Sequence, residues 1–205
     1  MTVLLLIRHG ETDWLGTQLA GRLPDIHLNE AGRAQAEALA VMLRPIPLKM
    51  IYSSPLERAL ETAEPTARAA GKRIIEDERL QEVDFGELTG KPFTELRGMS
   101  IWQDIHHTPA MVRYPGGESL SEAQDRAVRM VEELRGVEDA GIVACFTHAD
   151  TIRLTLAHLL HMPLAAYHTL VADPASISVV FITRKAVRVA GINLPAGSPL
   201  QVKAE

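Results

Sequence analysis

Two runs of consecutive apolar residues, Val3–Ile7 and Ile142–Phe146, constrain the fold of this chain more than any other feature. A strand with one exposed face alternates apolar and polar residues, whereas an uninterrupted apolar run is typical of a strand covered on both faces. Stretches with the apolar spacing of helices lie between these runs. We therefore predict an α/β fold of three layers, with a mostly parallel central sheet and helices on both faces.

Further elements follow from helical spacing and turn residues. The apolar spacing predicts a helix over Glu30–Leu43. Ser54 followed by Pro55 is a good helix start, and this helix should run to Ala70, with Gly71 after it. The same reasoning predicts helices near 119–134 and 150–160 and strands over Lys49–Tyr52, Lys72–Ile75, Ser176–Ile182 and Ala186–Ile192, the last two forming an antiparallel edge.

The chain shows neither an internal repeat nor a linker, so we expect a single domain over residues 1–194. Residues 195–205 offer little to bury and are expected to form a loose tail. The stretch from 79 to 117 is expected to be irregular, with one short helix over about Phe93–Met99.

The composition argues against several classes of protein. A formal net charge of −5 disfavours non-specific binding to nucleic acid or to an anionic membrane. Cys145 is the only cysteine, so neither a disulfide framework nor a thiolate zinc cluster can form. The opening apolar run follows no basic segment and is too short for a signal peptide or a membrane span. We expect a soluble cytoplasmic protein, a monomer or a homodimer, that binds neither nucleic acid nor membrane.

Charged and imidazole side chains follow three of the predicted strands. Arg8 and His9 come directly after the first strand, Arg58 lies in the first turn of the helix after the second, and His148 follows the strand at 142–146. Because parallel strands end at one edge of a sheet, these residues should converge there. Two arginines, two histidines and a helix N-terminus suit a tetrahedral oxyanion such as phosphate.

Such a cluster can transfer a phosphoryl group. A neutral histidine can attack phosphorus in line, while the second imidazole hydrogen-bonds an oxygen, and covalent catalysis divides the displacement into two easier transfers. The mechanism also needs an acid that protonates the leaving oxygen. A carboxyl group beside a bound phosphate suits this role because the like charge raises its pKa. The cluster alone does not select one of the 26 acidic residues for it.

Short motifs stand in a specific order along the chain, from its start to about residue 183. They include Leu6–Thr12 with Trp14, Gly21–Arg22, Ser53–Ala59, Leu80–Glu87, Pro115–Ser119 and Thr147–His148. Together they closely resemble the motifs of the histidine phosphatase superfamily, also called phosphoglycerate-mutase-like. The resemblance implies the phosphoglycerate-mutase-like form of the α/β fold.

The resemblance also implies a role for each site residue. His9 would be the nucleophile, Arg8, Arg58 and His148 would hold the phosphoryl group, and Glu82 would be the proton donor. Contacts with the phosphate or the substrate are further expected from Thr12, Gly21 and Ala149. Neither a metal ion nor a cofactor is expected, because no zinc-protease spacing occurs and the arginines beside the histidines would repel a cation.

Two positions depart from the family pattern. Leu15 stands where the family usually has an asparagine, and the lost hydrogen bond to phosphate is worth about 1 kcal/mol. Thr17 or Gln18 could supply it instead. Ala149 and Asp150 follow the second histidine, where many members have glycine, which changes the local backbone contacts.

The acid-containing motif separates a phosphatase from a mutase. Cofactor-dependent phosphoglycerate mutases resemble Glu-Arg-His-Tyr-Gly there, whereas this chain reads Glu-Val-Asp-Phe-Gly from Glu82. The basic and hydroxyl groups that help to hold the substrate carboxylate are absent, and Asp84 adds a carboxylate. We therefore predict a metal-independent phosphomonoester phosphatase, with a phosphoglycerate mutase or a non-catalytic phosphate-binding relative as the alternatives.

The segment from Val83 to Tyr114 is expected to cover the pocket. Its apolar and aromatic side chains suit a partly apolar phosphomonoester or a broad range of small phosphorylated metabolites, which includes the nucleoside-like substrate of the related α-ribazole phosphatases. The residues expected to line the pocket are Leu15, Thr17, Phe85, Trp102 and Arg113.

Overall fold

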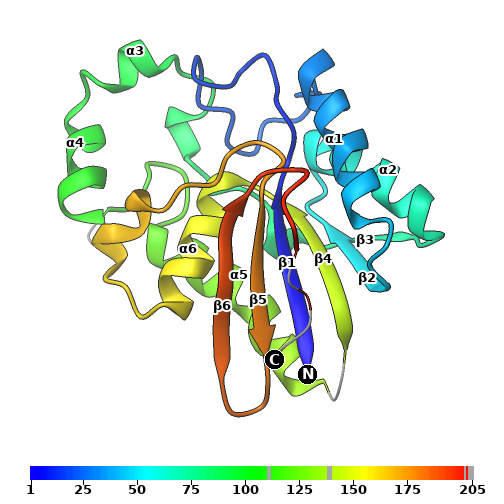
Figure 1. The fold of residues 1–205 in the computed structure, drawn as a ribbon. Coiled ribbons are helices and arrows are strands. Elements are labelled where there is room, and N and C mark those ends of the chain that lie inside the picture. The colour runs from blue at the N-terminus through cyan, green and yellow to red at the C-terminus, as the bar shows by residue number, and fades with distance from the viewer. Residues whose placement is uncertain (110–111, 138–139, 201, 203–205) are drawn as a thin grey trace.

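The computed structural model describes residues 1–109, 112–137, 140–200 and 202, and its centre is a six-stranded sheet (Figure 1). The strand order is β3-β2-β4-β1-β5-β6. Strands β1 to β4 pair in parallel, and β5 and β6 add an antiparallel edge, as predicted. The strands are β1 (Thr2–Arg8), β2 (Leu48–Ser53), β3 (Ile74–Glu76), β4 (Gly141–Thr147), β5 (Ile177–Ile182) and β6 (Val187–Leu194).

The register of β1 and β4 brings the two histidine motifs together. The strands pair from Thr2 opposite Gly141 to Arg8 opposite Thr147, so both end at the same level. The His9 amide then donates to the Thr147 carbonyl across 2.9 Å. In Figure 1 the N-terminus lies at the bottom and β1 runs upward, so the carboxyl edge of the sheet is at the top. The candidate site belongs to this edge.

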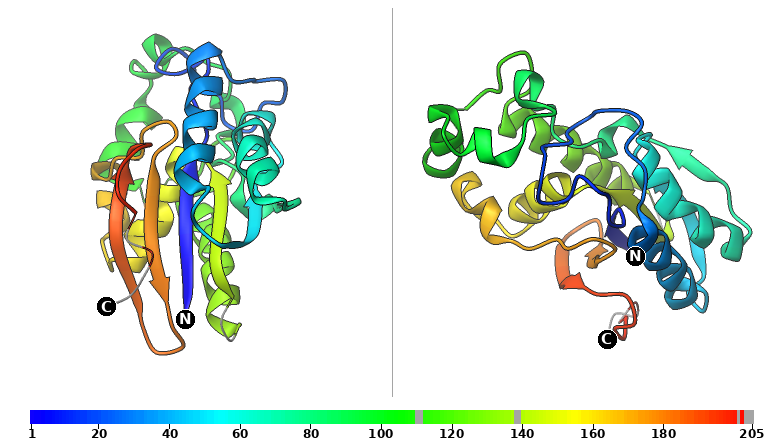
Figure 2. Two further views of the ribbon diagram at one scale, coloured as in Figure 1. Left: turned by 45° about the vertical axis from the view of Figure 1, so that its right-hand side comes forward. Right: turned by 90° about the horizontal axis from the view of Figure 1, so that it is seen from above.

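Helices cover both faces of the sheet, which gives the three predicted layers (Figure 2). The helices α1 (Glu30–Leu43) and α2 (Glu57–Ala70) pack with Val3, Leu5 and Ile7 of β1 in one apolar cluster. The helices α5 (Leu120–Gly136) and α6 (Ala149–Leu159) pack with Leu4 and Leu6 in a second cluster on the opposite face. Because β1 is buried on both faces, its sequence is an uninterrupted apolar run.

Two helix starts differ in how their first amides are satisfied. The Asn29 side chain caps α1 by accepting from the Gly32 amide at 2.8 Å, as expected of an N-cap residue. The prediction that Ser54 caps the next helix is wrong, because α2 begins at Glu57 and its N-cap residue, Leu56, has no capping side chain. The Ser54 hydroxyl instead lies 2.8 Å from Nε2 of His148. A residue with the sequence signature of a cap therefore belongs to the site.

The segment between β3 and α5 is more regular than predicted. It contains α3 (Phe93–Leu96), within the predicted short helix, and a second helix, α4 (Ser100–His107), that the sequence analysis missed. The α4 helix has no capping side chain at Met99, so its start carries no sequence signal. Short 3-10 turns lie at Glu78–Leu80, Gly86–Leu88 and Leu164–Thr169. The segment packs with α6 in a third apolar cluster that includes Leu96, Tyr114, Leu154 and Tyr167.

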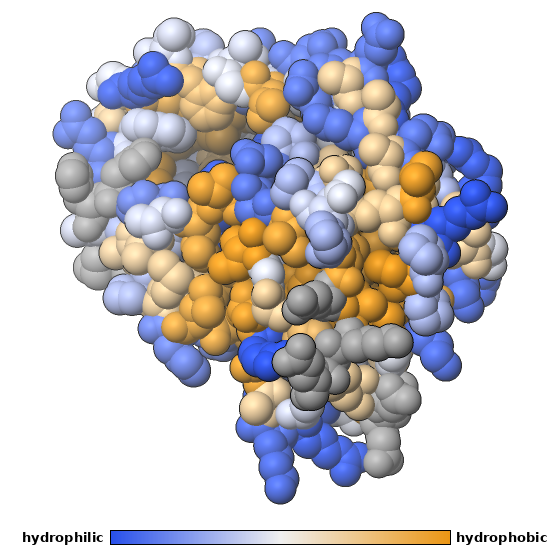
Figure 3. All heavy atoms as spheres, viewed as in Figure 1, coloured by the Kyte–Doolittle hydropathy of each residue, from blue (hydrophilic) through white to orange (hydrophobic). Residues whose placement is uncertain are grey.

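The described residues of the C-terminal tail do not lie free of the domain. Ala196, Leu200 and Val202 pack partly buried against the cluster of α1 and α2. Figure 3 shows apolar side chains gathered over the face formed by β5, β6 and this tail. The expected loose end is therefore part of the apolar packing as far as it is described, while residues 201 and 203–205 lie outside the described residues.

Candidate active site

A cavity of about 390 Å³ opens at the carboxyl edge of the sheet. Arg8 and His9 reach it from the end of β1, Arg58 from the first turn of α2, and Glu82 from the segment after the first 3-10 turn. Seen from above in Figure 2, the segment after β1 crosses this end of the molecule between α1 and the segment of α3 and α4. The aromatic side chains that line the cavity are Trp14, Phe85, Phe93, Trp102, Tyr114 and Tyr167.

The position of the loop after β1 requires glycine at two points. A Cβ on Gly10 would lie 2.7 Å from the Gly32 carbonyl, and a Cβ on Gly32 would lie 2.1 Å from the Glu11 carbonyl. The Gly10 amide donates to the Thr62 hydroxyl at 2.9 Å, and that hydroxyl donates to the Arg58 carbonyl at 2.6 Å. The start of α1 and the first turns of α2 therefore hold the loop that carries His9.

His9 is held as a neutral base. Its Nδ1 lies 2.7 Å from the Gly10 carbonyl, which can only accept, so Nδ1 carries the proton and Nε2 keeps its lone pair. Burial lowers the pKa of His9 well below the usual imidazole value, and the positive charges of Arg58 and Arg8 lower it further. The imidazole is therefore a nucleophile near neutral pH without an added base.

Arg8 and Arg58 present guanidinium groups that the protein satisfies only in part. Arg8 donates through Nη1 to the Ala172 carbonyl at 2.7 Å, and Arg58 donates through Nη2 to the Gly21 carbonyl at 2.6 Å. The Nε of each is buried and has no hydrogen-bond partner among the described residues. Burial lowers the pKa of Arg58 to about 10, so it stays charged at neutral pH. Arg58 is buried and Arg8 is partly buried, and two such cations with unused donors form a strong site for a phosphoryl group.

His148 completes the cluster from the N-cap position of α6. Its ring centroid lies 5.2 Å from that of His9, with an interplanar angle of 59°. Burial, Arg58 and His9 together lower the pKa of His148 well below the usual imidazole value. The Ser54 hydroxyl contacts Nε2, whereas Nδ1 is buried without a hydrogen-bond partner in the described part of the chain. If Ser54 donates to Nε2, the neutral tautomer places a donor at Nδ1 for an oxygen of a bound phosphoryl group.

Glu82 receives amide donors from the start of α6. Its Oε1 accepts from the Thr151 amide at 3.2 Å, and its Oε2 lies 3.4 Å from the Asp150 amide. Burial, followed by the negative charge of Asp150, raises the pKa of Glu82 despite these donors and the nearby Arg58. A carboxyl group with a raised pKa beside Arg8 and Arg58 can carry a proton when an anion occupies the cavity.

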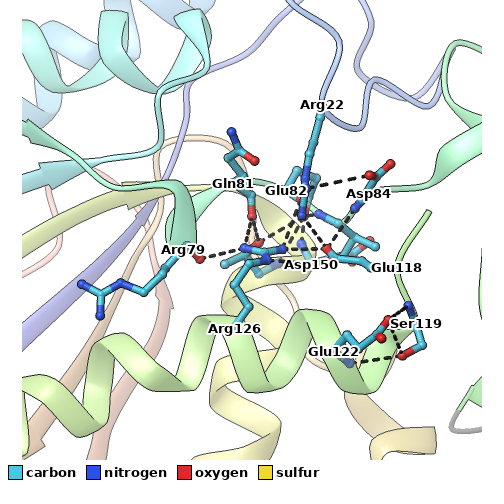
Figure 4. A network of polar contacts seen from close by, with 12 residues as sticks. Arg22, Arg79, Gln81, Glu82, Asp84, Glu118, Ser119, Glu122, Arg126 and Asp150 are labelled. Atoms are coloured by element: carbon cyan, nitrogen blue, oxygen red, sulfur yellow. Dashed lines mark hydrogen bonds and ion pairs between the residues drawn. The ribbon is translucent and has the colours of Figure 1, made fainter. Parts of the chain in front are cut away.

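Two arginines and Glu118 fix the backbone that carries Glu82 (Figure 4). Arg126 donates through Nη1 to the carbonyls of Arg79 at 2.7 Å and Gln81 at 2.9 Å, and Arg22 donates through Nε to the Glu82 carbonyl at 2.8 Å. Both arginines also pair with Oε1 of Glu118, at 2.7 and 2.8 Å. The acid is thus held by contacts from Arg22, Glu118 and Arg126, of which the first two lie in motifs that the sequence analysis named, whereas Arg126 was not singled out.

We predict that Arg126→Met lowers kcat for an alkyl phosphate about 10- to 100-fold, because a small displacement of the acid is costly in catalysis. The effect should be smaller for an aryl phosphate, whose leaving group needs less protonation. The measurement is kcat for both esters. Arg129→Met, on the exposed side of the same helix, is the control and should match the wild type. An equal loss on both esters would show that Arg126 does not act through Glu82.

The structure places most, but not all, of the predicted pocket residues at the cavity. Its lining includes Thr12, Gly21 and Ala149 and the pocket candidates Leu15, Phe85 and Trp102. Thr17 does not line it, because the Thr17 hydroxyl donates to the Trp14 carbonyl at 3.0 Å, so only Gln18 remains as a substitute for the usual asparagine. Arg113 also lies away from it and pairs with Glu122 and the Gly117 carbonyl.

Several cavity residues were missed by the sequence analysis as site residues. They include Asp150 and Arg153 on α6 and, from a separate segment, Tyr167 and His168. Asp150 and Arg153 are three residues apart at the start of the helix after the second histidine, and this spacing places both on one face. That signal was present in the sequence. No comparable pattern marks residues 167 and 168.

The sheet and the site together define a class: an α/β protein whose phosphate site is built from two neutral histidines and two arginines. The chain belongs to the histidine phosphatase superfamily (branch 1), whose family model matches residues 4–195. It is 31% identical to phosphoserine phosphatase 1 of Hydrogenobacter thermophilus over 90% of this chain and 89% of that protein. It is also 32% identical to a 2,3-bisphosphoglycerate-dependent phosphoglycerate mutase of Thermoplasma acidophilum, over 88% and 87% of the two chains.

The fold agrees with solved structures of this superfamily. A phosphoserine phosphatase of Entamoeba histolytica, solved in complex with 3-phosphoglyceric acid, superposes with a TM-score of 0.81 at 30% identity and covers 94% of this chain and 97% of its own. No described helix is both long and apolar enough to cross a lipid bilayer. Within the described residues, no three His, Cys, Asp or Glu side chains gather as a group that could hold a metal ion.

Proposed function

We propose that this protein is a phosphatase that hydrolyses small phosphomonoesters through a phosphohistidine on His9. The observation that carries the proposal is the 2.7 Å contact between Nδ1 of His9 and the Gly10 carbonyl, which leaves the Nε2 lone pair free at a cavity that Arg8 and Arg58 also line. Phosphatase relatives that span nearly the whole chain support it. A cytoplasmic location is part of the proposal and is compatible with the single buried thiol of Cys145.

In the first transfer, Nε2 of His9 attacks phosphorus as the bond to the leaving oxygen breaks. The electron pair of that bond goes to the leaving oxygen, which takes the proton of Glu82. Arg8, Arg58 and His148 stabilise the negative charge on the transferred group, and this stabilisation supplies much of the rate gain. The products are phosphohistidine, ionised Glu82 and a free alcohol.

In the second transfer, water attacks the phosphohistidine in line. Glu82, now a carboxylate, takes a proton from the water as the new P–O bond forms. The P–N bond breaks and returns its electron pair to Nε2, so His9 is again neutral. Inorganic phosphate leaves and Glu82 is protonated for the next cycle. No step needs a metal ion.

The alternative of a phosphoglycerate mutase has support from three relatives of that name but less from the residues at the site. Val83 and Phe85 are apolar and buried where mutases have basic and hydroxyl groups. The Asp84 carboxylate, which the sequence analysis noted in the acid-containing motif, would repel phosphoglycerate only if it faced the site, but it lies 3.8 Å from Arg22 and does not line the cavity. Asp150 lines the cavity instead and supplies the negative charge.

The pH dependence follows from the shifted pKa values of His9 and Glu82. His9 must be unprotonated, and its lowered pKa keeps it so below pH 6.5, while Glu82 must be protonated, and its raised pKa extends that state above the usual carboxyl range. We expect kcat to peak at mildly acidic pH. Asp150→Asn should move the alkaline limb to lower pH, because it removes a charge that raises the pKa of Glu82. Asp125→Asn, which changes an exposed residue on α5, should leave the alkaline limb at its wild-type position.

The proposal is tested by phosphate release from a panel of phosphomonoesters in the presence of EDTA. The panel holds an aryl phosphate, phosphoglycerates, sugar phosphates and nucleotides. Chelator-resistant hydrolysis is the expected result. Binding without turnover would indicate a non-catalytic relative, and phosphoglycerate isomerisation stimulated by the bisphosphate would indicate the mutase.

A further inference from the structure

A second polar cluster lines the cavity and supplies neither the nucleophile, the proton nor the phosphoryl contacts of the two proposed transfers. It consists of Asp150 and Arg153 from the start of α6 with Tyr114 and Tyr167, and is called here the leaving-group subsite. Arg153 donates through Nη1 to Oδ1 of Asp150 at 3.0 Å. This pair leaves one carboxylate oxygen and several guanidinium donors for other partners.

The two tyrosines of the subsite are buried side chains that line the cavity. Tyr114 is 2% exposed and Tyr167 is 5% exposed. The Nε of Arg153 is buried and has no hydrogen-bond partner among the described residues. Buried polar groups are normally hydrogen-bonded, so this unpartnered nitrogen, at a cavity that two tyrosines also line, indicates a polar ligand.

The leaving-group subsite lies where the alcohol part of a substrate must go. The Asp150 amide is 3.4 Å from Oε2 of Glu82, so Asp150 is next to the proposed proton donor. Both residues belong to the polar network in Figure 4. Glu82 must reach the leaving oxygen, and the rest of the leaving group continues from that atom. Phe85 stacks edge-on against Tyr114, with centroids 5.0 Å apart, and adds an apolar wall.

The charges of the cavity indicate the net charge of that leaving group. Its arginines are Arg8, Arg58 and Arg153, and its carboxylates are Asp150 and Glu82, of which Glu82 is protonated in the productive complex. Two positive charges therefore remain, and a phosphomonoester carries between one and a half and two negative charges, roughly, near neutral pH. A carboxylate on the leaving group would add an unbalanced charge beside Asp150 in a partly buried site.

We propose that the leaving-group subsite selects phosphomonoesters whose leaving group has no net charge and carries several hydrogen-bonding groups. Two kinds of compound have this chemistry: neutral polyols, including sugars, and zwitterionic hydroxy-amino acids. The tyrosine hydroxyls and the Asp150–Arg153 pair can bind the hydroxyls of the first kind or the ammonium and carboxylate of the second. The inference rests on the proposed phosphatase function.

The test compares kcat/KM for glycerol phosphate, O-phosphoserine, 3-phosphoglycerate and phenyl phosphate. For the wild type, 3-phosphoglycerate should be at least about tenfold poorer than the better of the first two. Asp150→Asn should shift the ratio of 3-phosphoglycerate to glycerol phosphate at least about tenfold toward the carboxylated ester. Both esters need Glu82, so its altered pKa cancels from this ratio. Asp125→Asn makes the same charge change at an exposed site and should leave the ratio unchanged.

A second variant tests the hydroxyls. Tyr167→Phe should lower kcat/KM about fivefold for the hydrogen-bonding esters and leave phenyl phosphate unchanged. A preference for glycerol phosphate or for O-phosphoserine over 3-phosphoglycerate supports the inference. Which of the two is preferred identifies the leaving group as a neutral polyol or as a zwitterionic hydroxy-amino acid. Hydrolysis with a ratio that Asp150→Asn does not move overturns it while the proposed function stands. Hydrolysis of no ester by the wild type overturns the proposed function itself.

Discussion

His9→Ala is expected to lower kcat for every phosphomonoester on the order of 10⁴-fold or more, because no other group can form the covalent intermediate. His9 is the imidazole whose free nitrogen is set by the Gly10 carbonyl, and His148 is engaged with Ser54. Wild-type protein quenched in alkali after mixing with a radiolabelled ester should carry a phosphoryl group that acid removes, and the variant should carry none. Phosphate release and the quenched label are the two measurements.

Two controls separate loss of the nucleophile from loss of the fold. His27→Ala changes a half-exposed histidine that pairs with Glu61 outside the cavity, and it should keep wild-type activity. The His9→Ala protein should still bind inorganic phosphate, since Arg8, Arg58 and His148 remain, and calorimetry would measure this. Activity within tenfold of the wild type would contradict the phosphohistidine mechanism.

The sequence predicts the sheet and the arginine–histidine cluster because both depend on local patterns. The run Val3–Ile7 is apolar throughout because β1 is buried on both faces, and its parallel pairing with β4 fixes where Arg8 and His148 emerge. Helical spacing likewise predicts a helix over Glu30–Leu43, and α1 has these bounds in the structure. These signals lie within one element, so a single sequence is enough to read them.

The remaining parts of the site depend on contacts between distant segments. Glu82 follows a 3-10 turn and owes its position to Arg126, whose side chain crosses to it from α5. No periodicity connects these two residues, so only the family resemblance selected Glu82. The same reason explains why Tyr167 was missed, as it enters the cavity from a short 3-10 segment after α6. Ser54 was misassigned because a hydroxyl suits a helix cap and a histidine contact equally well.

Glu82 has two proposed roles, as the acid of the first transfer and as the base of the second, and the electrostatics of the site bear on both. Burial keeps both imidazoles neutral and makes ionisation of Glu82 unfavourable, while both arginines keep their charge. An arriving phosphate dianion favours the proton on Glu82 further. When the alcohol has left, ionised Glu82 is a stronger base because of the same burial. One environment thus suits Glu82 for both of its proposed roles.

Glu82→Gln is expected to lower kcat by about 10²- to 10⁴-fold for an alkyl phosphate, since the alkoxide must then leave without a proton. An aryl phosphate with a stabilised leaving group should lose far less in the first transfer, and the labelled phosphohistidine should accumulate because the second transfer still lacks its base. Glutamine keeps the size of the side chain and an oxygen for the Thr151 amide. The measurements are steady-state kcat for both esters and the fraction of labelled enzyme after an alkaline quench.

The control for this variant is Glu87→Gln, which removes a charge from an exposed residue of the same segment and should match the wild type. Arg126→Met combined with Glu82→Gln should be no slower on the alkyl ester than Glu82→Gln alone, because Arg126 acts by positioning a proton that is no longer there. If both esters lose activity equally in Glu82→Gln and no phosphohistidine accumulates, the proton donor is another group. Asp150 would then be the first candidate, as it is the other carboxylate that lines the cavity.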